Sequence, residues 1–139
     1  MAFDGPVEDR LAIRELVAAY GDAVSRNSTE DWAALWAEDA MWCLPEIPGM
    51  ERIEGRDAIV AAWVEAMKGF PFQVNIQTPG DTRVTGDRAN GHTYTSELVK
   101  DAEGTPARWT GHYTDDYVKR DGRWLFKSRT FRILHIGVA

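Results

Sequence analysis

The hydrophobic period of this chain changes once, at Pro71, and this change limits the possible folds more than any other feature. Before Pro71, apolar residues recur at the spacing of a helix with one buried stripe. After it, apolar and polar residues alternate, as in strands with one buried side. Helices that precede a run of antiparallel strands indicate an α+β domain, with the helices on one face of a curved sheet.

The part of the chain before Pro71 predicts three helices. The first spans residues 6–25, with its apolar side chains on one stripe. The second is short and begins at Ser28, which forms a weak capping box with Asp31, and the helical spacing continues to Trp36.

A brief apolar run over residues 41–44 predicts a short strand that enters a proline-rich loop. The third helix follows, with its apolar stripe over residues 59–67, and it ends at Gly69. Asp121-Gly122 predicts a tight hairpin turn in the second half of the chain. The strands predicted there are residues 72–77, 82–85, 89–99, 108–120 and 123–136.

Composition excludes several classes of protein. A length of 139 residues suits one domain, which we place over residues 1–139. With 16 basic and 22 acidic residues the net charge is −6, so nucleic acid is not an expected partner. A content of 44% hydrophobic and 27% charged residues is typical of a globular protein that folds in water, so no membrane partner is expected.

The sequence also argues against disulfides, metals and cofactors. Cys43 is the single cysteine, and the start of the chain lacks the pattern of an export signal, so we expect a cytoplasmic protein. The three histidines have no metal-ligand spacing, and no phosphate-binding glycine pattern occurs. We therefore expect neither a metal nor an organic cofactor.

Four local phrases, in this order, match a known family. They are Ile13 to Tyr20, Asp31-Trp32-Ala33-Ala34-Leu35-Trp36 before Glu38-Asp39-Ala40, Gly55-Arg56-Asp57-Ala58-Ile59, and Tyr117-Val118-Lys119-Arg120-Asp121-Gly122-Arg123-Trp124. Over nearly its whole length the chain resembles the SnoaL-like branch of the nuclear transport factor 2-like superfamily. The resemblance implies a conical α+β barrel with a pocket between sheet and helices, and homodimers or higher homo-oligomers.

The resemblance also shows where the chain departs from its relatives. Dehydratase and dehydrochlorinase relatives use an Asp near the end of the first helix to orient a His on the first long strand. Those positions correspond to Ser25 and Val74, and neither residue accepts a proton near neutral pH. A shift of one residue would instead place Gln73 and Asn75 in the pocket.

Four residues are the catalytic candidates. His92 is a general base by its titration range, and Asp22, on the helix face of Ser25, is a substitute carboxylate. Tyr20 resembles a family position that donates a hydrogen bond to substrate oxygen, and Arg129 would bind a substrate anion. The structural alternatives are an exposed His92, Asp22 paired with Arg26, a core Tyr20, and Arg129 paired with an acid such as Asp22.

The resemblance, together with strand parity and helix spacing, implies the candidate substrate-binding wall. His112 and His135 are weaker catalytic candidates, the first by its opposite parity and the second by its place near the terminus. The wall consists of Ser25, Trp42, Trp63, Val74, Tyr94, Ser96, Trp109, Tyr113 and Phe131.

These features predict a cofactor-independent lyase, dehydratase or isomerase that acts on a hydrophobic, aromatic or polycyclic small molecule. The alternative is a non-catalytic small-molecule-binding or assembly module, because both residues of the usual dyad are missing. A third hypothesis is that the chain resembles the small subunit of aromatic-ring dioxygenases, which would require a larger metal-bearing partner.

Overall fold

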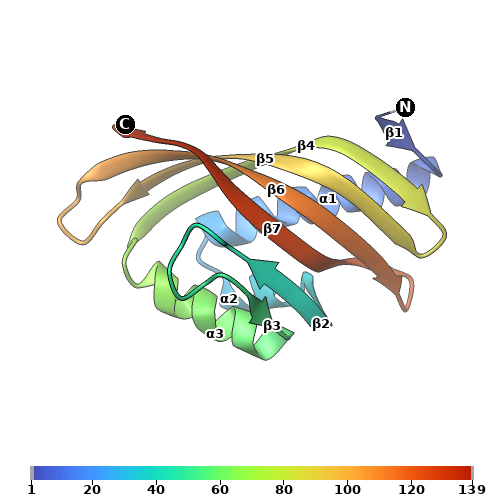
Figure 1. Ribbon diagram of the computed structural model, residues 1–139, viewed down its shortest axis with the longest axis horizontal. Helices are drawn as coiled ribbons and strands as arrows, with labels where there is room; N and C mark the ends of the chain where they lie inside the picture. Colours follow the sequence, from blue (N-terminus) through green and yellow to red (C-terminus); the bar gives the residue numbers. More distant parts are fainter. Residues whose placement is uncertain (1, 139) are drawn as a thin grey trace.

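The computed structural model describes residues 2–138, in which three helices pack against a curved seven-stranded sheet (Figure 1). The strands lie in the order β1-β4-β5-β6-β7-β2-β3. Helix α1 runs along one face of the long strands, and the two ends of the chain lie at opposite ends of the sheet (Figure 1). This arrangement confirms the predicted fold class. The helices are α1 (Val7–Ser25), α2 (Thr29–Ala33) and α3 (Arg56–Met67), and the strands are β1 (Phe3–Asp4), β2 (Trp36–Cys43), β3 (Ile53–Glu54), β4 (Phe72–Thr85), β5 (Arg88–Lys100), β6 (Pro106–Arg120) and β7 (Arg123–Val138).

The helices form where the sequence predicts them, with one difference at α2. The Ser28 side chain accepts a hydrogen bond from the backbone N–H of Asp31, as expected of an N-cap. The helix ends at Ala33, however, and Trp36 already belongs to β2. Trp36 lies opposite Phe126 in a parallel pairing with β7, and this tertiary pairing overrides the local helical spacing.

The two short strands predicted after Pro71 form one long strand, β4. It pairs with β5 along its whole length, with one register shift between Pro79 and Asp81. On its other side β4 pairs only with β1, at Thr82 and Arg83. Pro79 therefore lies in a strand whose other side is largely unpaired, where a proline is tolerated, and the strand continues through it.

The sheet is mixed rather than purely antiparallel. Strands β4 to β7 pair antiparallel, joined by tight turns such as Asp121-Gly122, where both residues have positive φ, 52° and 76°. Strand β2 runs parallel to β7, and the two-residue β1 runs parallel to β4. The short strands β1 and β3 have too few residues to show a pattern in the sequence.

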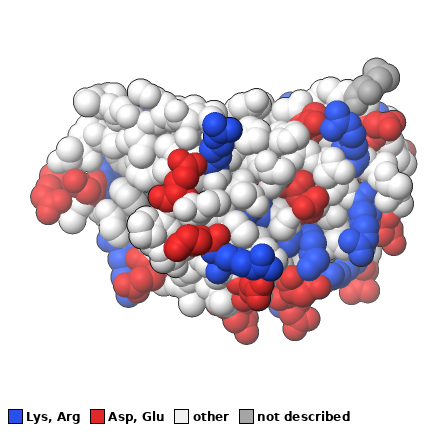
Figure 2. All heavy atoms as spheres, in the orientation of Figure 1, with Lys and Arg blue, Asp and Glu red and all other residues white. Residues whose placement is uncertain are grey.

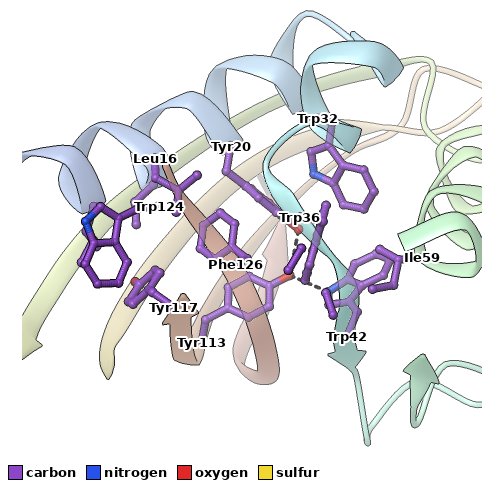
Figure 3. Close-up of a cluster of buried hydrophobic side chains, with 14 of the residues drawn as sticks. Leu16, Tyr20, Trp32, Trp36, Trp42, Ile59, Tyr113, Tyr117, Trp124 and Phe126 are labelled. Carbon is purple, nitrogen blue, oxygen red and sulfur yellow. Dashed lines mark hydrogen bonds between the residues drawn. The ribbon is translucent and has the colours of Figure 1, made fainter. Parts of the chain in front are cut away.

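Aromatic side chains fill the space between the inner face of the sheet and the helices (Figure 3). The Trp32 ring stacks on Trp63 with centroids 4.6 Å apart, and Tyr20 meets Phe126 edge to face at 5.4 Å. Trp36 is fully buried beside them. These rings fill much of the space between the sheet and the helices, and the space that stays open lies at one end.

The long strands of the sheet carry several exposed apolar side chains. In Figure 2, Lys, Arg, Asp and Glu are sparse at the upper left, over the far ends of the long strands, and gather at the lower right. The homodimer implied by the resemblance stays a prediction. The exposed apolar residues include Phe72, Val74, Ile76, Tyr94, Leu134 and Ile136.

Candidate active site

A cavity of about 130 Å³ lies between the inner face of the sheet, α1, α3 and the loop after β2. Most of its wall is apolar, and the carboxyl, amide and hydroxyl groups come from α1 and from β4, β5 and β6. Such a concave, mainly apolar site with a few polar groups is typical of small-molecule sites. The wall is formed by Tyr20, Val24, Trp42, Leu44, Ile47, Met50, Trp63, Ala66, Met67, Phe70, Gln73, Asn75, Glu97, Val99, Trp109, Tyr113 and Phe131.

Glu97 is the acidic residue of this wall, and sequence reasoning missed it. Its Oε2 accepts a hydrogen bond of 2.7 Å from Nε2 of Gln73, on the neighbouring strand. Burial raises the pKa of Glu97 to about 7, against the smaller opposing effects of the Gln73 hydrogen bond and the Arg129 charge. The carboxyl group therefore exchanges its proton near neutral pH.

Two tyrosine hydroxyl groups meet in the cavity wall (Figure 3). The Tyr20 and Tyr113 oxygens are 3.4 Å apart, and the Tyr113 oxygen accepts a hydrogen bond of 3.2 Å from Nε1 of Trp42. Burial raises the pKa of both tyrosines above the usual tyrosine value. Both hydroxyl groups consequently stay protonated at neutral pH, and they can serve as hydrogen-bond donors.

Ser25 and Val74, at the positions of the usual dyad, do not form a catalytic pair. The Ser25 Oγ donates to the carbonyl oxygen of Gly21 at 2.8 Å and accepts from the backbone N–H of Asn75 at 2.8 Å. Ser25 thus ties α1 to β4 and lies outside the cavity wall. Val74 is 38% exposed on the outer face, so its predicted place in the pocket is wrong, and Gln73 and Asn75 line the cavity instead.

The parity predicted for β5 is wrong by one residue. His92 and Tyr94 are exposed on the outer face, and Ser96 follows the same parity, so none of the three lines the cavity. Nδ1 of His92 lies 2.8 Å from Oδ1 of Asp81, on the outer face. Both faces of β5 carry polar residues, so hydrophobic alternation could not select the inner one.

His112 also lies outside the cavity wall, as its parity predicts. Its ring stacks on His92, with centroids 5.2 Å apart. His135 is exposed. None of the three histidines, all of which are described, lines the cavity, so the general base expected from the sequence is not found there as a histidine.

Asp22 and Arg129 take part in other contacts. Asp22 is exposed at the surface and pairs with Arg26, four residues later, at 2.9 Å. Arg129 is fully buried and pairs with Asp115 rather than with Asp22; its Nε donates to Oδ1 of Asp115 at 2.7 Å. Its guanidinium group also lies 3.7 Å from the ring centroid of Tyr113. Arg129 supports the tyrosine pair from outside the cavity wall.

The structure brings the other predicted aromatic residues into the cavity wall. Trp42, Trp63 and Trp109 come from β2, α3 and β6, and Phe131 comes from β7 beside Tyr113. In the described part of the chain, no group of three or more His, Cys, Asp or Glu side chains is placed to hold a metal ion. The polar chemistry of the cavity is thus one carboxyl group, two amides and two phenol hydroxyls, beside tryptophan N–H groups.

The register of the sheet contains the signal that would have found Glu97. Glu97 lies opposite Trp109, and Thr93 lies opposite Tyr113, in the β5–β6 pairing. Residues paired across a ladder point to the same face, so inward-facing Trp109 and Tyr113 require an inward-facing Glu97. The strand pattern alone gave no register, and an inward-facing glutamate is unusual enough to argue against that choice.

A curved sheet covered by helices on one face is also the fold of a Streptomyces avermitilis protein of the nuclear transport factor 2-like family, which is 18% identical to this chain with a TM-score of 0.80 over 94% of this chain and 99% of that one. The chain belongs to the SnoaL-like domain family, whose model matches residues 6–130. Among curated proteins, none matches this chain at a significant level.

Solved structures agree with this family. A Novosphingobium aromaticivorans protein provisionally named a scytalone dehydratase is 24% identical, with a TM-score of 0.84 over 96% of this chain and 89% of that one. A protein of the same species provisionally named an aromatic ring hydroxylase is 23% identical, with a TM-score of 0.86 over 97% and 96%. A hexachlorocyclohexane dehydrochlorinase from Novosphingobium barchaimii is 22% identical, with a TM-score of 0.78 over 96% and 91%. At these identities the similarity shows the fold and not the reaction.

None of the helices within residues 2–138 combines the length and apolar character needed to span a bilayer.

Proposed function

We propose that this chain is a cofactor-independent lyase or isomerase in which Glu97 moves the proton. The observation that carries the proposal is a carboxyl group with a pKa of about 7 in the wall of an apolar cavity. A general acid or base works best when its pKa lies near the working pH, because both protonation states are then available. Glu97 takes the role that the sequence suggested for His92 or Asp22, which lie outside the cavity wall.

The reaction class follows from the groups that face the cavity. Ionised Glu97 removes a proton from the carbon beside a substrate carbonyl, and the electron pair of that C–H bond moves onto the carbonyl oxygen. The Tyr20 and Tyr113 hydroxyl groups share one hydrogen bond, and the hydroxyl group that does not donate to its neighbour donates a hydrogen bond that stabilises this oxygen charge. In a β-hydroxy ketone the electron pair then returns and expels hydroxide, which takes the proton from Glu97 and leaves as water. In an isomerisation the proton returns to a different carbon.

The family and the names of similar structures support a lyase-type role in general. Scytalone dehydratase is named for removing water, and hexachlorocyclohexane dehydrochlorinase for removing hydrogen chloride. Both names describe an elimination, the same class of reaction that a carboxylate base in an apolar cavity can start.

Two simple ketones that give the same product test the proposal. Dehydration of 3-hydroxycyclohexanone and isomerisation of cyclohex-3-enone both yield cyclohex-2-enone, whose conjugation is followed by ultraviolet absorbance. We expect Glu97→Gln to lower the rate about 10²- to 10⁴-fold. We also expect the rate of the unaltered protein to rise with pH through about 7, as Glu97 ionises.

His92→Gln and Asp22→Asn are the matched controls, because they remove the other candidate titratable groups without touching the cavity wall. Both should keep the parent rate. Equal rates for Glu97→Gln and the parent, or a pH profile without an inflection near 7, would contradict the role of Glu97.

A binding protein without catalysis is the second candidate, and the state of the dyad positions favours it. Ser25 is held in hydrogen bonds to the backbone of Gly21 and Asn75, and no histidine lines the cavity. Saturable binding of one-ring compounds, with no product from either ketone, would support this candidate instead.

A further inference from the structure

Gly111, on β6, leaves the space that the ring of Phe131 occupies on the inner face of the sheet. A Cβ atom at position 111 would collide with Cε1 and Cζ of Phe131 and would lie 2.8 Å from Oγ1 of Thr95. Phe131 pairs with Tyr113, and the two rings are 4.9 Å apart. The ring of Phe131 is thus seated over Gly111, with Tyr113 at its side.

The position of this ring sets one wall of the cavity. Phe131 is 6% exposed and lines the cavity together with Tyr113 and Glu97. The sheet lies under the ring, so a side chain at position 111 would push the ring away from the sheet, on the side where the cavity lies. Packed aromatic rings do not compress, and such a shift would reduce the space for a guest.

We propose that Gly111 and Phe131 together act as a size filter that limits the cavity to one-ring compounds. Gly111 is a positioning residue that acts through Phe131, and Phe131 is the residue that meets the guest. This inference rests on the proposed function only for the identity of the site, because binding can be measured without turnover.

The cavity volume supports the limit of one ring. At about 130 Å³ it is close to the engineered apolar cavity of roughly 150 Å³ that binds benzene. On the side of the cavity that β7 forms, a second fused ring would need the space that Phe131 fills. The polycyclic substrates expected from the sequence are therefore disfavoured, and monocyclic ones are favoured.

The sheet offers a matched control on its opposite face. Gly80 lies under the ring of Tyr94, and a Cβ atom there would lie 3.2 Å from Cε2 of that ring. Tyr94 is 52% exposed and lies outside the cavity wall. Gly80→Ala therefore makes the same chemical change beneath an aromatic ring without changing the cavity.

Calorimetric titration with phenol, as the one-ring probe, and 2-naphthol, as the two-ring probe, tests the filter. The unaltered protein should bind phenol at least about tenfold more tightly than 2-naphthol, and Phe131→Leu should remove that preference. Gly111→Ala should weaken phenol binding by about tenfold or more, and Gly80→Ala should leave it unchanged. Thermal melting of each variant shows that it is folded.

The double variant Gly111→Ala/Phe131→Leu gives the sharpest result. If Gly111 acts through Phe131, the smaller side chain makes room for the new methyl group and restores phenol binding. A double variant as weak as Gly111→Ala alone, equal binding of both probes to the unaltered protein, or no binding of either probe would overturn the proposal.

Glu97→Gln separates this inference from the proposed function. The variant should keep the one-ring preference even where turnover is lost, because Gln has nearly the shape of Glu. If Glu97→Gln lost the one-ring preference but kept catalysis, the filter alone would be refuted. If it lost catalysis but kept the preference, the filter would stand.

Discussion

Two carboxylates lie on the inner face of the same sheet, Asp115 on β6 and Glu97 on β5, and their surroundings differ. Asp115 is 1% exposed and accepts hydrogen bonds from Arg129, from the Thr93 hydroxyl at 2.6 Å and from the Tyr117 hydroxyl at 3.1 Å. Glu97 accepts one side-chain hydrogen bond, from Gln73.

The difference shows how one sheet face serves both stability and chemistry. At the filled end, the charge of Asp115 is matched by an arginine and by hydroxyl groups, so it holds β5, β6 and β7 together. At the open end, Glu97 has a wall of apolar groups and one amide, so its charged form is disfavoured near neutral pH. The filled end stabilises the pairing of the long strands, which we call the frame. The open end carries a carboxyl group that gains and loses a proton near neutral pH.

Arg129→Met should give the largest effect, because it leaves Asp115 buried without its counter-charge. We expect a loss of about 3–5 kcal/mol in the free energy of unfolding, measured by urea denaturation. The double variant Arg129→Met/Asp115→Leu should recover a large part of this loss, because it removes the stranded charge as well. A single variant as stable as the parent would show that the pair does not hold the frame.

Glu97→Gln should act with the opposite sign and only at higher pH. The pKa of Glu97 is raised in the folded protein from 4.5 to about 7, so the folded state binds more protons than the unfolded state between these values. The stabilisation from protonated Glu97 is present below about pH 4.5 and is lost as the pH rises through 7. The variant should thus be more stable than the parent at pH 8, on the order of 1–3 kcal/mol.

Urea denaturation at pH 5 and pH 8 measures this difference. Glu103→Gln is the control, because Glu103 is exposed in the loop between β5 and β6. It should change stability by less than about 0.5 kcal/mol at either pH. If Glu97→Gln and Glu103→Gln behaved alike at both pH values, Glu97 would not be desolvated.

Most of the helices and strands could be predicted from the sequence, because hydrophobic periodicity indicates which side of an element is buried. The stripe of α1 and the Asp121-Gly122 turn were predicted from local pattern and local turn chemistry. The end of α2 was not, because Trp36 follows a helical spacing but pairs with β7, more than eighty residues away in the chain. Long-range pairing leaves no local signal.

The candidate site was predicted less well, and β5 shows why. Its inner face carries Thr93, Thr95 and Glu97, and its outer face carries His92 and Tyr94, so hydrophobicity does not distinguish the two faces. Chemical expectation favoured the histidine, because histidine is the residue type most often used as a general base. In the structure, burial raises the pKa of a glutamate to about 7.

Tyr113→Phe should have a smaller effect at the boundary between the two ends. It removes the oxygen that accepts from Nε1 of Trp42 and leaves that buried N–H unpaired, at a cost of about 1–2 kcal/mol in stability. Tyr20→Phe should cost less, because Trp42 keeps its acceptor and the lost contact is 3.4 Å long. Equal losses in urea denaturation would mean that the Trp42 bond does not contribute.

His92→Gln should give the smallest effect, because His92 is exposed on the outer face, where its side chain contacts Asp81 and stacks on His112. Its stability in urea should stay within about 0.5 kcal/mol of the parent. A larger loss would mean that the outer face is also part of the frame.

The central claim is that Glu97 gains and loses its proton near neutral pH, and its titration in the folded protein tests this directly. Carbon-13 NMR of the glutamate side-chain carboxyl groups, with the Glu97 resonance assigned by its loss in Glu97→Gln, gives the midpoint. The account predicts a midpoint near 7. A midpoint at the ordinary value of 4.5 would contradict it.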